Sequence, residues 1–379
     1  MHPEDRHVIF CFAGQGYVPL DASRDLFKTC EVFRKSIEEV DSAVEAFYEA
    51  ESELPTSIPL SKYLKEREPR PAHTPSFDSE SVVVDNGKLA TPTATMVIFA
   101  AQYALARTIE AHGIQPSGIV GYSFGEHIAS VVTGSLPLDA GICYLLRREK
   151  LMEDRGLVPN VGGMVTVQAE PEKVTQALAA NGASGEVEIS GYPHKTSTIL
   201  SGDAKALDDA QEALDDGDID TQRRAIQLGM HSSHIEAITD RIRNDPLVFS
   251  DEESSNAKVL PGIDHWSCLG VQLSEGTPLN AKYWATQLRS PIHFKQCIEG
   301  IYHGSVTKSP QKKIVFLDLG MGPRLARLIQ NTLQDTPEWK RGQIEAISCI
   351  QPMALDAAAK EKRGWAFEEL TTRLGLSSG

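Results

Sequence analysis

Residues 121–127 read Gly-Tyr-Ser-Phe-Gly-Glu-His, a Gly-x-Ser-x-Gly motif that is typical of a nucleophilic serine on a sharp turn. An apolar run at 118–120 precedes the motif, and a helix-like run at 128–132 follows it. Strand, turn and helix therefore come in the order that such a nucleophile requires. Ser123 would lie exposed at the tip of the turn, at the positive end of a helix, where a developing oxyanion is stabilised.

A serine nucleophile needs a base, and three histidines are candidates. His127 follows Ser123 by four residues on the predicted helix, so its ring is poorly aimed at a hydroxyl on the preceding turn. His231 and His234 lie close together further along the chain, where it returns from a predicted insert. His231 follows small and apolar residues and precedes a serine, and this context favours it over His234.

A glycine-flanked glutamine could supply the oxyanion hole. Gly14-Gln15-Gly16 follows a continuously apolar strand predicted at 7–12. Open α/β sheets bind their ligands at the carboxyl ends of their strands. Either the side-chain amide or the backbone N–H of Gln15 could donate a hydrogen bond to an oxyanion.

The elements that would position these residues alternate between apolar strands and helices, which predicts an α/β fold with a parallel sheet. A further buried strand is predicted at 313–319, and another strand at 344–350. A stretch rich in proline, serine and charged residues at 68–80 predicts a surface excursion. Helical spacing predicts helices at 24–49, 93–111, 127–134, 138–154, 233–243 and 324–334, within 278–303, and over most of 355–379.

A segment of different character, 161–228, interrupts this pattern. It predicts strands at 164–167, 187–190, 198–201 and 221–228, with helices at 171–181 and 204–215. The order βαββαβ is that of a ferredoxin-like unit. We therefore expect a large α/β-hydrolase-like domain from residues 1–160 and 229–379, and a small inserted subdomain from 161–228.

Composition limits the setting of the protein. The chain has 379 residues, 41% of them hydrophobic, and a net charge of −15, which disfavours binding to nucleic acid or anionic membranes. No apolar run approaches the roughly 20 residues of a membrane helix, and the polar N-terminus is not a signal peptide. Six scattered cysteines without a C-x-x-C pair disfavour a zinc site and favour a reducing, cytoplasmic setting.

Taken together in chain order, these motifs resemble those of the malonyl-CoA:acyl-carrier-protein acyltransferases of fatty acid and polyketide synthesis. The resemblance covers about residues 8–350, so the chain is similar to a freestanding acyltransferase or to an excised synthase domain, and we expect a monomer. The matching features are Gly14-Gln15-Gly16, Gly121-x-Ser123-x-Gly125-Glu126, Arg148-x-x-Leu-Met152, the ferredoxin-like insert, His231-Ser232, Tyr283-Trp284 with Arg289-x-Pro291, and Asp318-x-Gly320-x-Gly322.

The resemblance implies a ping-pong acyl transfer without a cofactor or metal of the enzyme's own. Ser123 would attack the thioester of an acyl-CoA, with His231 as general base. Backbone N–H groups of Gln15 and Phe124 would hold the oxyanion. The phosphopantetheine thiol of an acyl carrier protein, or of a polyketide synthase, would then take the acyl group. Backbone carbonyls would orient the histidine, in place of an acidic third member.

The resemblance also assigns the substrate. Arg148 would grip the free carboxylate of an acyl group such as malonyl, because a planar guanidinium binds a carboxylate bidentately. Tyr122 stands where the family usually has histidine, and Leu228-Gly-Met-His231 matches neither common specificity stretch. Met230 fills space more as phenylalanine does, which favours malonyl.

The carrier protein would need a local basic face on this acidic chain. We expect that face at Arg223 and Arg224, or at Lys312, Lys313 and Arg324.

Two other kinds of enzyme remain as alternatives. An α/β-hydrolase esterase shares the Gly-x-Ser-x-Gly motif, but places an acid between its serine and a late histidine. An acyl hydrolase, or thioesterase, on the fold of the resembled family would release acyl groups to water. An esterase has no role for Arg148 or for the Gly-Gln-Gly turn. Arg148 also argues against the acyl hydrolase, because it suits a substrate that bears a carboxylate.

Overall fold

A computed structural model of the chain describes residues 6–15, 20–51, 60–61, 92–154, 156–158, 160–182, 187–224, 226–320 and 322–350. The surface excursion predicted at 68–80 and the helix predicted at 355–379 lie outside the described residues. The described part contains two β-sheets, one of six strands and one of four.

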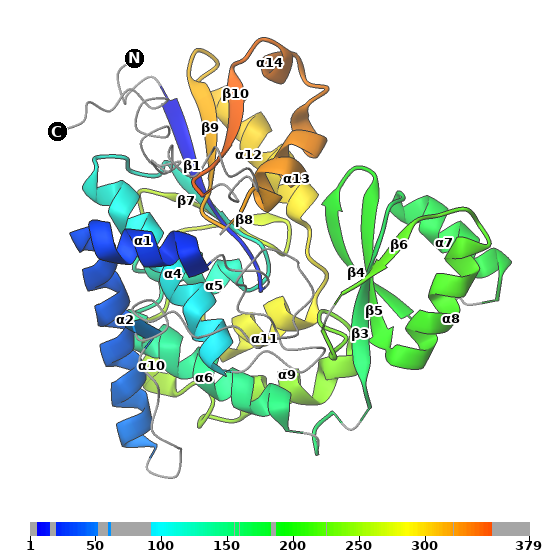
Figure 1. Ribbon diagram of the computed structural model, residues 1–379, viewed down its shortest axis with the longest axis horizontal. Helices are drawn as coiled ribbons and strands as arrows, with labels where there is room; N and C mark the ends of the chain where they lie inside the picture. Colours follow the sequence, from blue (N-terminus) through cyan, green and yellow to red (C-terminus); the bar gives the residue numbers. More distant parts are fainter. Residues whose placement is uncertain are drawn as a thin grey trace.

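The six-stranded sheet forms the centre of the larger unit (Figure 1). Its first five strands are parallel, and only β8 runs antiparallel to its neighbour β7. The central strand β1 is buried from Val8 to Phe12, as its continuously apolar sequence predicts. In spatial order the strands are β10 (Ile344–Ser348), β9 (Lys313–Asp318), β1 (Arg6–Phe12), β2 (Gly118–Gly121), β7 (Asp264–Ser267) and β8 (Val271–Leu273).

Strands β7 and β8 were not predicted from the sequence. They have four and three residues. β7 reads Asp-His-Trp-Ser, which has no apolar run, and the alternation of Val-Gln-Leu in β8 is too short to be recognised as a strand. Pairing with β2 and β7 in the folded protein, rather than local propensity, forms these strands.

Helices surround this sheet. The single helix predicted at 24–49 is wrong: Cys30 adopts an extended conformation and divides the segment into two helices. The helix predicted at 233–243 begins instead with a 3₁₀ turn, η3 (Ser233–Ile235). The helices are α1 (Leu20–Thr29), α2 (Glu31–Ala50), α4 (Pro92–Ala111), α5 (Gly125–Val132), α6 (Leu138–Glu153), α9 (Glu236–Asn244), α10 (Asp251–Asn256), α11 (Ala281–Arg289), α12 (Phe294–Lys308), α13 (Arg324–Leu333) and α14 (Pro337–Lys340).

The four-stranded sheet belongs to a smaller unit, which lies beside the larger one in Figure 1. Its elements follow in the order β3 (Gly162–Val167), α7 (Pro171–Ala180), β4 (Val187–His194), β5 (Ser197–Asp203), α8 (Ala204–Asp215) and β6 (Thr221–Arg223). The sheet is antiparallel, with spatial order β4-β5-β3-β6. The strand predicted at 221–228 was too long, because pairing with β3 ends at Arg223.

The smaller unit has an apolar core of its own, which includes Val165, Leu200 and Leu207. A β-bridge joins Gly191 of this unit to Ile292 of the larger one. The ion pair between Arg289 and Glu188 adds a polar link at the same border. These contacts join β4 of the smaller unit to the end of α11 (Ala281–Arg289) and the segment that follows it in the larger one.

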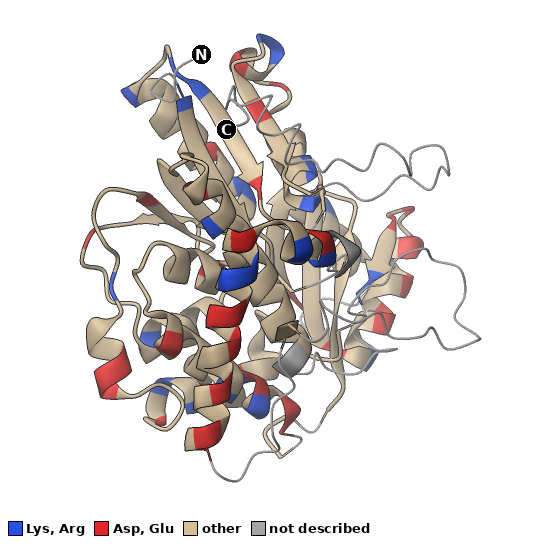
Figure 2. Cartoon of the chain, turned by 60° about the vertical axis from the view of Figure 1, so that its left-hand side comes forward, with Lys and Arg blue, Asp and Glu red and all other residues tan. Residues whose placement is uncertain are grey.

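Charged residues are spread over the surface. Figure 2 shows acidic and basic residues interspersed over the visible helices, with the acidic residues repeated along one of them. Several charged residues form ion pairs within one helix, such as Lys35 with Glu31 and Lys295 with Glu299. Pairs of this kind contribute only about 0.3–0.5 kcal/mol each, so they matter more for solubility than for the fold.

Candidate active site

Ser123 occupies a strained turn between β2 and α5. Its φ angle is +53°, a left-handed conformation that non-glycine residues rarely adopt. The flanking glycines are required by close approach: a Cβ on Gly121 would overlap Glu126 N, and one on Gly125 would overlap the Phe12 carbonyl oxygen. The turn predicted by the Gly-x-Ser-x-Gly motif is therefore present, packed against the end of β1.

His231 faces this serine from the loop that leaves the smaller unit. Its Nε2 lies 2.7 Å from Ser123 Oγ. The Nδ1 atom lies 2.9 Å from the backbone carbonyl oxygen of Ser290, which can only accept a hydrogen bond. Nδ1 must then carry the proton, so the neutral ring leaves Nε2 free to accept the Ser123 hydroxyl proton. No carboxylate is needed to select this tautomer.

Burial also keeps His231 neutral. The side chain is almost fully enclosed, and this desolvation lowers the pKa of the imidazole to about 4. The hydrogen bond to Ser290 opposes the shift, and the positive charge of Arg148 adds to it. At neutral pH the ring is therefore an unprotonated base beside the serine hydroxyl.

The two rival histidines point elsewhere. The ring of His127 stacks on Trp284 with ring centroids 4.1 Å apart, and its Nδ1 lies 3.2 Å from the Phe124 carbonyl oxygen. His234 Nδ1 accepts a hydrogen bond from Gly229 N at 3.3 Å. Of the three histidines considered from the sequence, the structure brings only His231 to Ser123.

A buried polar cluster supports the turn that carries Ser123. The sequence did not predict this cluster. Gln287 of α11 donates its Nε2 hydrogen bond to the Ser123 carbonyl oxygen at 2.9 Å. Glu126 accepts a hydrogen bond from Cys268 N at 2.9 Å and another from the Tyr283 hydroxyl. Burial raises the pKa of Glu126, and these donors oppose that shift. Glu126 and Tyr283 stand in the motifs that resemble the family, and Tyr283 and Gln287 lie four residues apart, on one face of a helix.

Gln15 lies near the serine, at the end of β1. A Cβ on its neighbour Gly14 would be 2.8 Å from the Tyr122 carbonyl oxygen and 3.8 Å from Ser123 Cβ. The side-chain amide of Gln15 donates to Thr95 Oγ1 at 3.3 Å and to Glu149 Oε1 at 3.4 Å. With its amide so occupied, Gln15 has its backbone N–H as the better candidate donor to an oxyanion. Phe124 is the N-cap residue of α5 and directly follows Ser123.

Arg148 projects from α6 toward the same turn. Its side chain is 2% exposed, and its guanidinium carbon lies 5.3 Å from the centroid of the Phe124 ring. The guanidinium donates to the carboxylate of Glu149, the next residue along α6, with Nη2 2.5 Å from Oε1. The sequence did not single out Glu149, although its place beside Arg148 could have drawn attention to it.

The three residues expected to shape acyl specificity are all buried near the serine. Tyr122 packs edge-on against Phe294, with ring centroids 5.2 Å apart. Leu228 and Met230 lie in the loop that ends at His231, and both belong to the core of the larger unit. Burial raises the pKa of the Tyr122 hydroxyl, and the charges of Arg224 and Arg324 partly oppose that shift. Two arginines therefore lie close to Tyr122.

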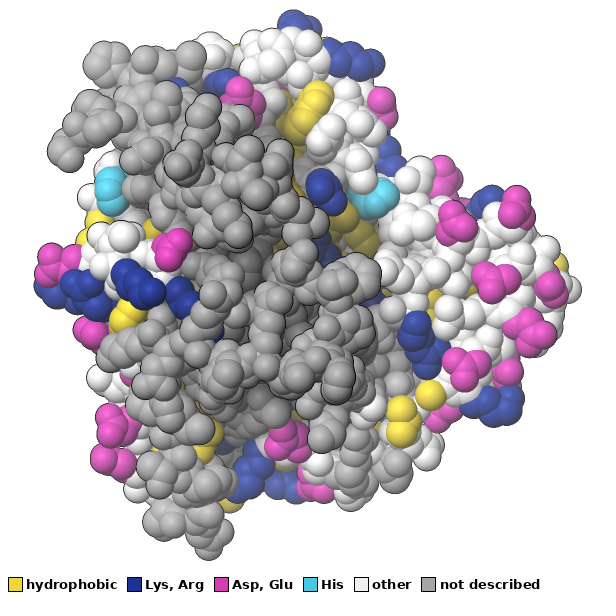
Figure 3. Space-filling view, viewed as in Figure 1, with side chains coloured by type: hydrophobic (Ala, Val, Ile, Leu, Met, Phe, Trp, Pro, Cys, Tyr) yellow, Lys and Arg dark blue, Asp and Glu magenta, His cyan; other side chains and the backbone are white. Residues whose placement is uncertain are grey.

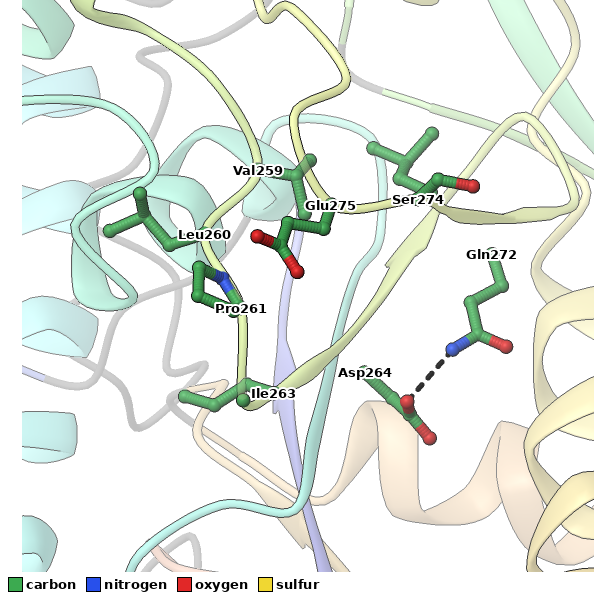
Figure 4. A pocket seen from close by; sticks show the side chains of 10 residues that line it. Val259, Leu260, Pro261, Ile263, Asp264, Gln272, Ser274 and Glu275 are labelled. Carbon is green, nitrogen blue, oxygen red and sulfur yellow. Dashed lines mark hydrogen bonds between the residues drawn. The ribbon is translucent and has the colours of Figure 1, made fainter.

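A separate surface hollow lies far from this chemistry. It is lined by residues on either side of the β7–β8 hairpin, where Gln272 donates to Asp264 at 2.8 Å (Figure 4). Asp264 pairs with Gly118, at the start of β2, whereas Ser123 follows the end of β2. In the part of the chain that the structure describes, no group of three histidine, cysteine or acidic residues is placed to hold a metal ion. No helix among these residues is long and apolar enough to cross a membrane.

Comparison with known proteins assigns a family to this arrangement. The profile of the acyl transferase domain family matches residues 9–347. Polyketide synthase GfsB of Streptomyces halstedii is 27% identical over 330 residues, which cover 87% of this chain and 5% of that protein. The chain spans 4% to 14% of the length of such curated relatives.

Solved structures share the fold. The acyltransferase domain from the second module of the salinomycin polyketide synthase matches with a TM-score of 0.68 and 23% identity, over 97% of this chain and 77% of that one. The malonyl CoA-acyl carrier protein transacylase from Coxiella burnetii matches with a TM-score of 0.65 and 18% identity, over 91% and 94% of the two chains.

Proposed function

This chain belongs to the acyl transferase domain family, and on that basis we propose that it transfers an acyl group from coenzyme A to the phosphopantetheine thiol of an acyl carrier protein. The carrier is either a separate protein or part of a polyketide or fatty acid synthase. The observation that carries the proposal is the contact of 2.7 Å between Ser123 Oγ and His231 Nε2, with His231 Nδ1 on the Ser290 carbonyl.

The acylation step follows from this geometry. Ser123 Oγ bonds to the thioester carbon as its proton moves to His231 Nε2. The negative charge on the carbonyl oxygen is held by the backbone N–H groups of Gln15 and Phe124. The carbon–sulfur bond then breaks, and coenzyme A leaves as a thiol after it receives the proton from His231.

Transfer to the carrier runs the same path in reverse. His231 takes the proton of the phosphopantetheine thiol, whose sulfur attacks the ester on Ser123. The oxyanion forms at the same two N–H groups, and Ser123 recovers its proton as the ester bond breaks. Hydrolysis of the Ser123 ester would follow the same steps with a water oxygen in place of the thiol sulfur. The enzyme must therefore favour attack by a bound thiol over attack by water.

We propose malonyl as the acyl group. Arg148 supports this choice, because its buried guanidinium lies beside Phe124, the residue after the nucleophile. A guanidinium in that place can bind the carboxylate at the far end of a malonyl group. Tyr122, Leu228 and Met230 would line the remainder of the acyl pocket.

We propose that Arg224 and Arg324 bind a phosphate of the coenzyme A or phosphopantetheine arm. The two charges come from different units, and Figure 3 shows basic side chains along the border between these units. Burial lowers the pKa of Arg324, and the nearby charge of Arg224 lowers it further. Neither forms an ion pair with a carboxylate among the described residues. Arg223 and Lys313, by contrast, pair with Asp208 and Glu345.

We propose that residues 161–228 form a ferredoxin-like subdomain inserted between 1–160 and 229–379, which the βαββαβ order and the antiparallel sheet support. All six cysteines are free thiols, which supports a reducing, cytoplasmic setting. We further propose a monomer without a resident cofactor.

Intact-protein mass spectrometry tests the proposal directly. The protein is incubated with malonyl-, methylmalonyl-, acetyl- and propionyl-CoA, and the added mass is located by peptide mapping. We expect an ester on Ser123, which a carrier protein with its phosphopantetheine arm removes faster than water does. Removal at equal rates with the armed and the unarmed carrier would instead indicate an acyl hydrolase.

A further inference from the structure

Glu149 holds the guanidinium that would bind the substrate carboxylate. Its Oε1 accepts hydrogen bonds from Arg148 Nη2 at 2.5 Å and from Arg148 Nε at 3.2 Å. Both side chains are 2% exposed, so little solvent screens the pair. Arg148 therefore already has a counter-ion before any substrate arrives.

The same oxygen contacts a second part of the site. Gln15 Nε2 lies 3.4 Å from Glu149 Oε1, and Gln15 follows β1 beside the Ser123 turn. Glu149 therefore lies between the proposed oxyanion donor and the proposed carboxylate clamp.

The neighbouring arginine shows the contrast. Arg147 is 24% exposed and pairs with Glu253 of α10 at 3.2 Å and with Glu51 at 3.6 Å. Its counter-ions come from other elements, at the border of the protein with solvent. Of these two arginines, Arg148 alone has its described counter-ion enclosed beside the nucleophile.

We infer, building on the acyl transfer proposed above, that Glu149 determines acyl specificity by weakening the preference of the site for acyl groups with a terminal carboxylate. A malonyl carboxylate would share one buried guanidinium with Glu149, and two carboxylates on one cation repel each other in a dry site. An acetyl or propionyl group carries no charge, and the Arg148–Glu149 pair beside it has no net charge, so no such repulsion arises. Glu149 thus narrows the discrimination between malonyl and uncharged acyl groups.

The Glu149→Gln variant isolates the charge, because glutamine keeps an oxygen that can accept from Arg148. Rates of Ser123 ester formation are measured with malonyl-CoA and with acetyl-CoA. We expect E149Q to raise the malonyl-to-acetyl rate ratio by roughly tenfold or more. E153Q, which removes the same charge from an exposed position one turn along α6, should leave the ratio unchanged.

A double variant tests whether the effect acts through Arg148. In the R148M background, E149Q should no longer raise the ratio by the same factor, because the guanidinium that the two carboxylates share is absent. Thermal melting monitors folding, and E149S serves as a second uncharged variant if E149Q does not fold.

The possible failures are distinguishable. An unchanged or lowered malonyl-to-acetyl ratio in E149Q, with esters still formed on Ser123, would overturn the role of Glu149 alone. A lowered ratio would mean that Glu149 instead positions Arg148 for malonyl. If no variant forms an ester with any acyl-CoA, the proposed acyl transfer itself fails.

Discussion

Ser123 and His231 are 108 residues apart in the chain, yet Ser123 Oγ and His231 Nε2 lie 2.7 Å apart. Both residues adopt positive φ angles, +53° and +60°. Such conformations cost about 1–3 kcal/mol each, and they persist only where the surrounding structure holds them. Here Gln287 holds the Ser123 carbonyl and the Ser290 carbonyl holds the His231 ring. Segments before and after the smaller unit thus meet in one strained contact.

Replacing either member of this pair should stop acylation. We expect Ser123→Ala to abolish the ester, and His231→Ala to slow its formation by roughly 10³-fold or more. His234→Asn is the matched control, since His234 contacts Gly229 rather than Ser123. Intact mass after timed exposure to malonyl-CoA measures all three. An ester that still forms in the Ser123 variant would place the nucleophile elsewhere.

The pH dependence of acylation should report the low pKa of His231. Since this pKa is about 4, the ring remains an unprotonated base well below pH 6.5. We expect the single-turnover rate to stay level from pH 7 to about 5, and to fall as pH drops through about 4. Circular dichroism at each pH confirms that the protein is folded. A midpoint near 6.5, the ordinary value for histidine, would contradict the buried neutral base.

Removing the charge of Arg148 should move the fall in acylation rate at low pH to higher pH, because that charge lowers the pKa of His231.

Arg148→Met should also lower malonyl loading at least tenfold relative to acetyl loading, about 1.4 kcal/mol. It leaves Glu149 buried without its counter-ion, so the melting temperature should fall as well. Arg147→Met is the control. Equal losses with both acyl-CoAs would remove the proposed role in binding a carboxylate.

The two arginines near Tyr122 should act on the phosphate-bearing arm and not on the acyl group. We expect Arg224→Gln and Arg324→Gln to raise KM for every acyl-CoA by a similar factor. The malonyl-to-acetyl ratio should stay constant. Lys313→Gln is the control, because Lys313 pairs with Glu345 at the far end of β9. Unchanged KM values in both variants would move the phosphate site elsewhere.

The turn glycine Gly125 should tolerate no side chain. A Cβ there would overlap the Phe12 carbonyl oxygen, so Gly125→Ala should destabilise the protein by roughly 2–4 kcal/mol. Gly304 lies inside α12 with no atom near its added Cβ, so Gly304→Ala should stabilise by about 0.5–1 kcal/mol. Urea unfolding followed by circular dichroism measures both, and a Gly125→Ala variant as stable as the parent would contradict the packing of the turn.

The sequence by itself determined the local parts of this site. The glycines around Ser123 encode a strand-turn-helix, because only glycine permits the close approach of Glu126 and Phe12. The apolar strands β1 and β9 and the helix that carries Arg148 were likewise predicted, because their patterns are continuous and local. The order of motifs along the chain also indicated the family.

Only the tertiary structure decided which groups meet. The sequence favoured His231 over His127 and His234 from context alone, and the folded chain brings its Nε2 to Ser123 and a backbone carbonyl to its Nδ1. A backbone carbonyl has no sequence signature, so Ser290 could not be predicted as that partner. The pairing of Glu149 with Arg148 could not be predicted from spacing, because adjacent residues of a helix point in different directions. Only the folded chain shows that both side chains are buried and in contact. The low pKa of His231 has the same origin, since desolvation arises only when distant segments close over the ring.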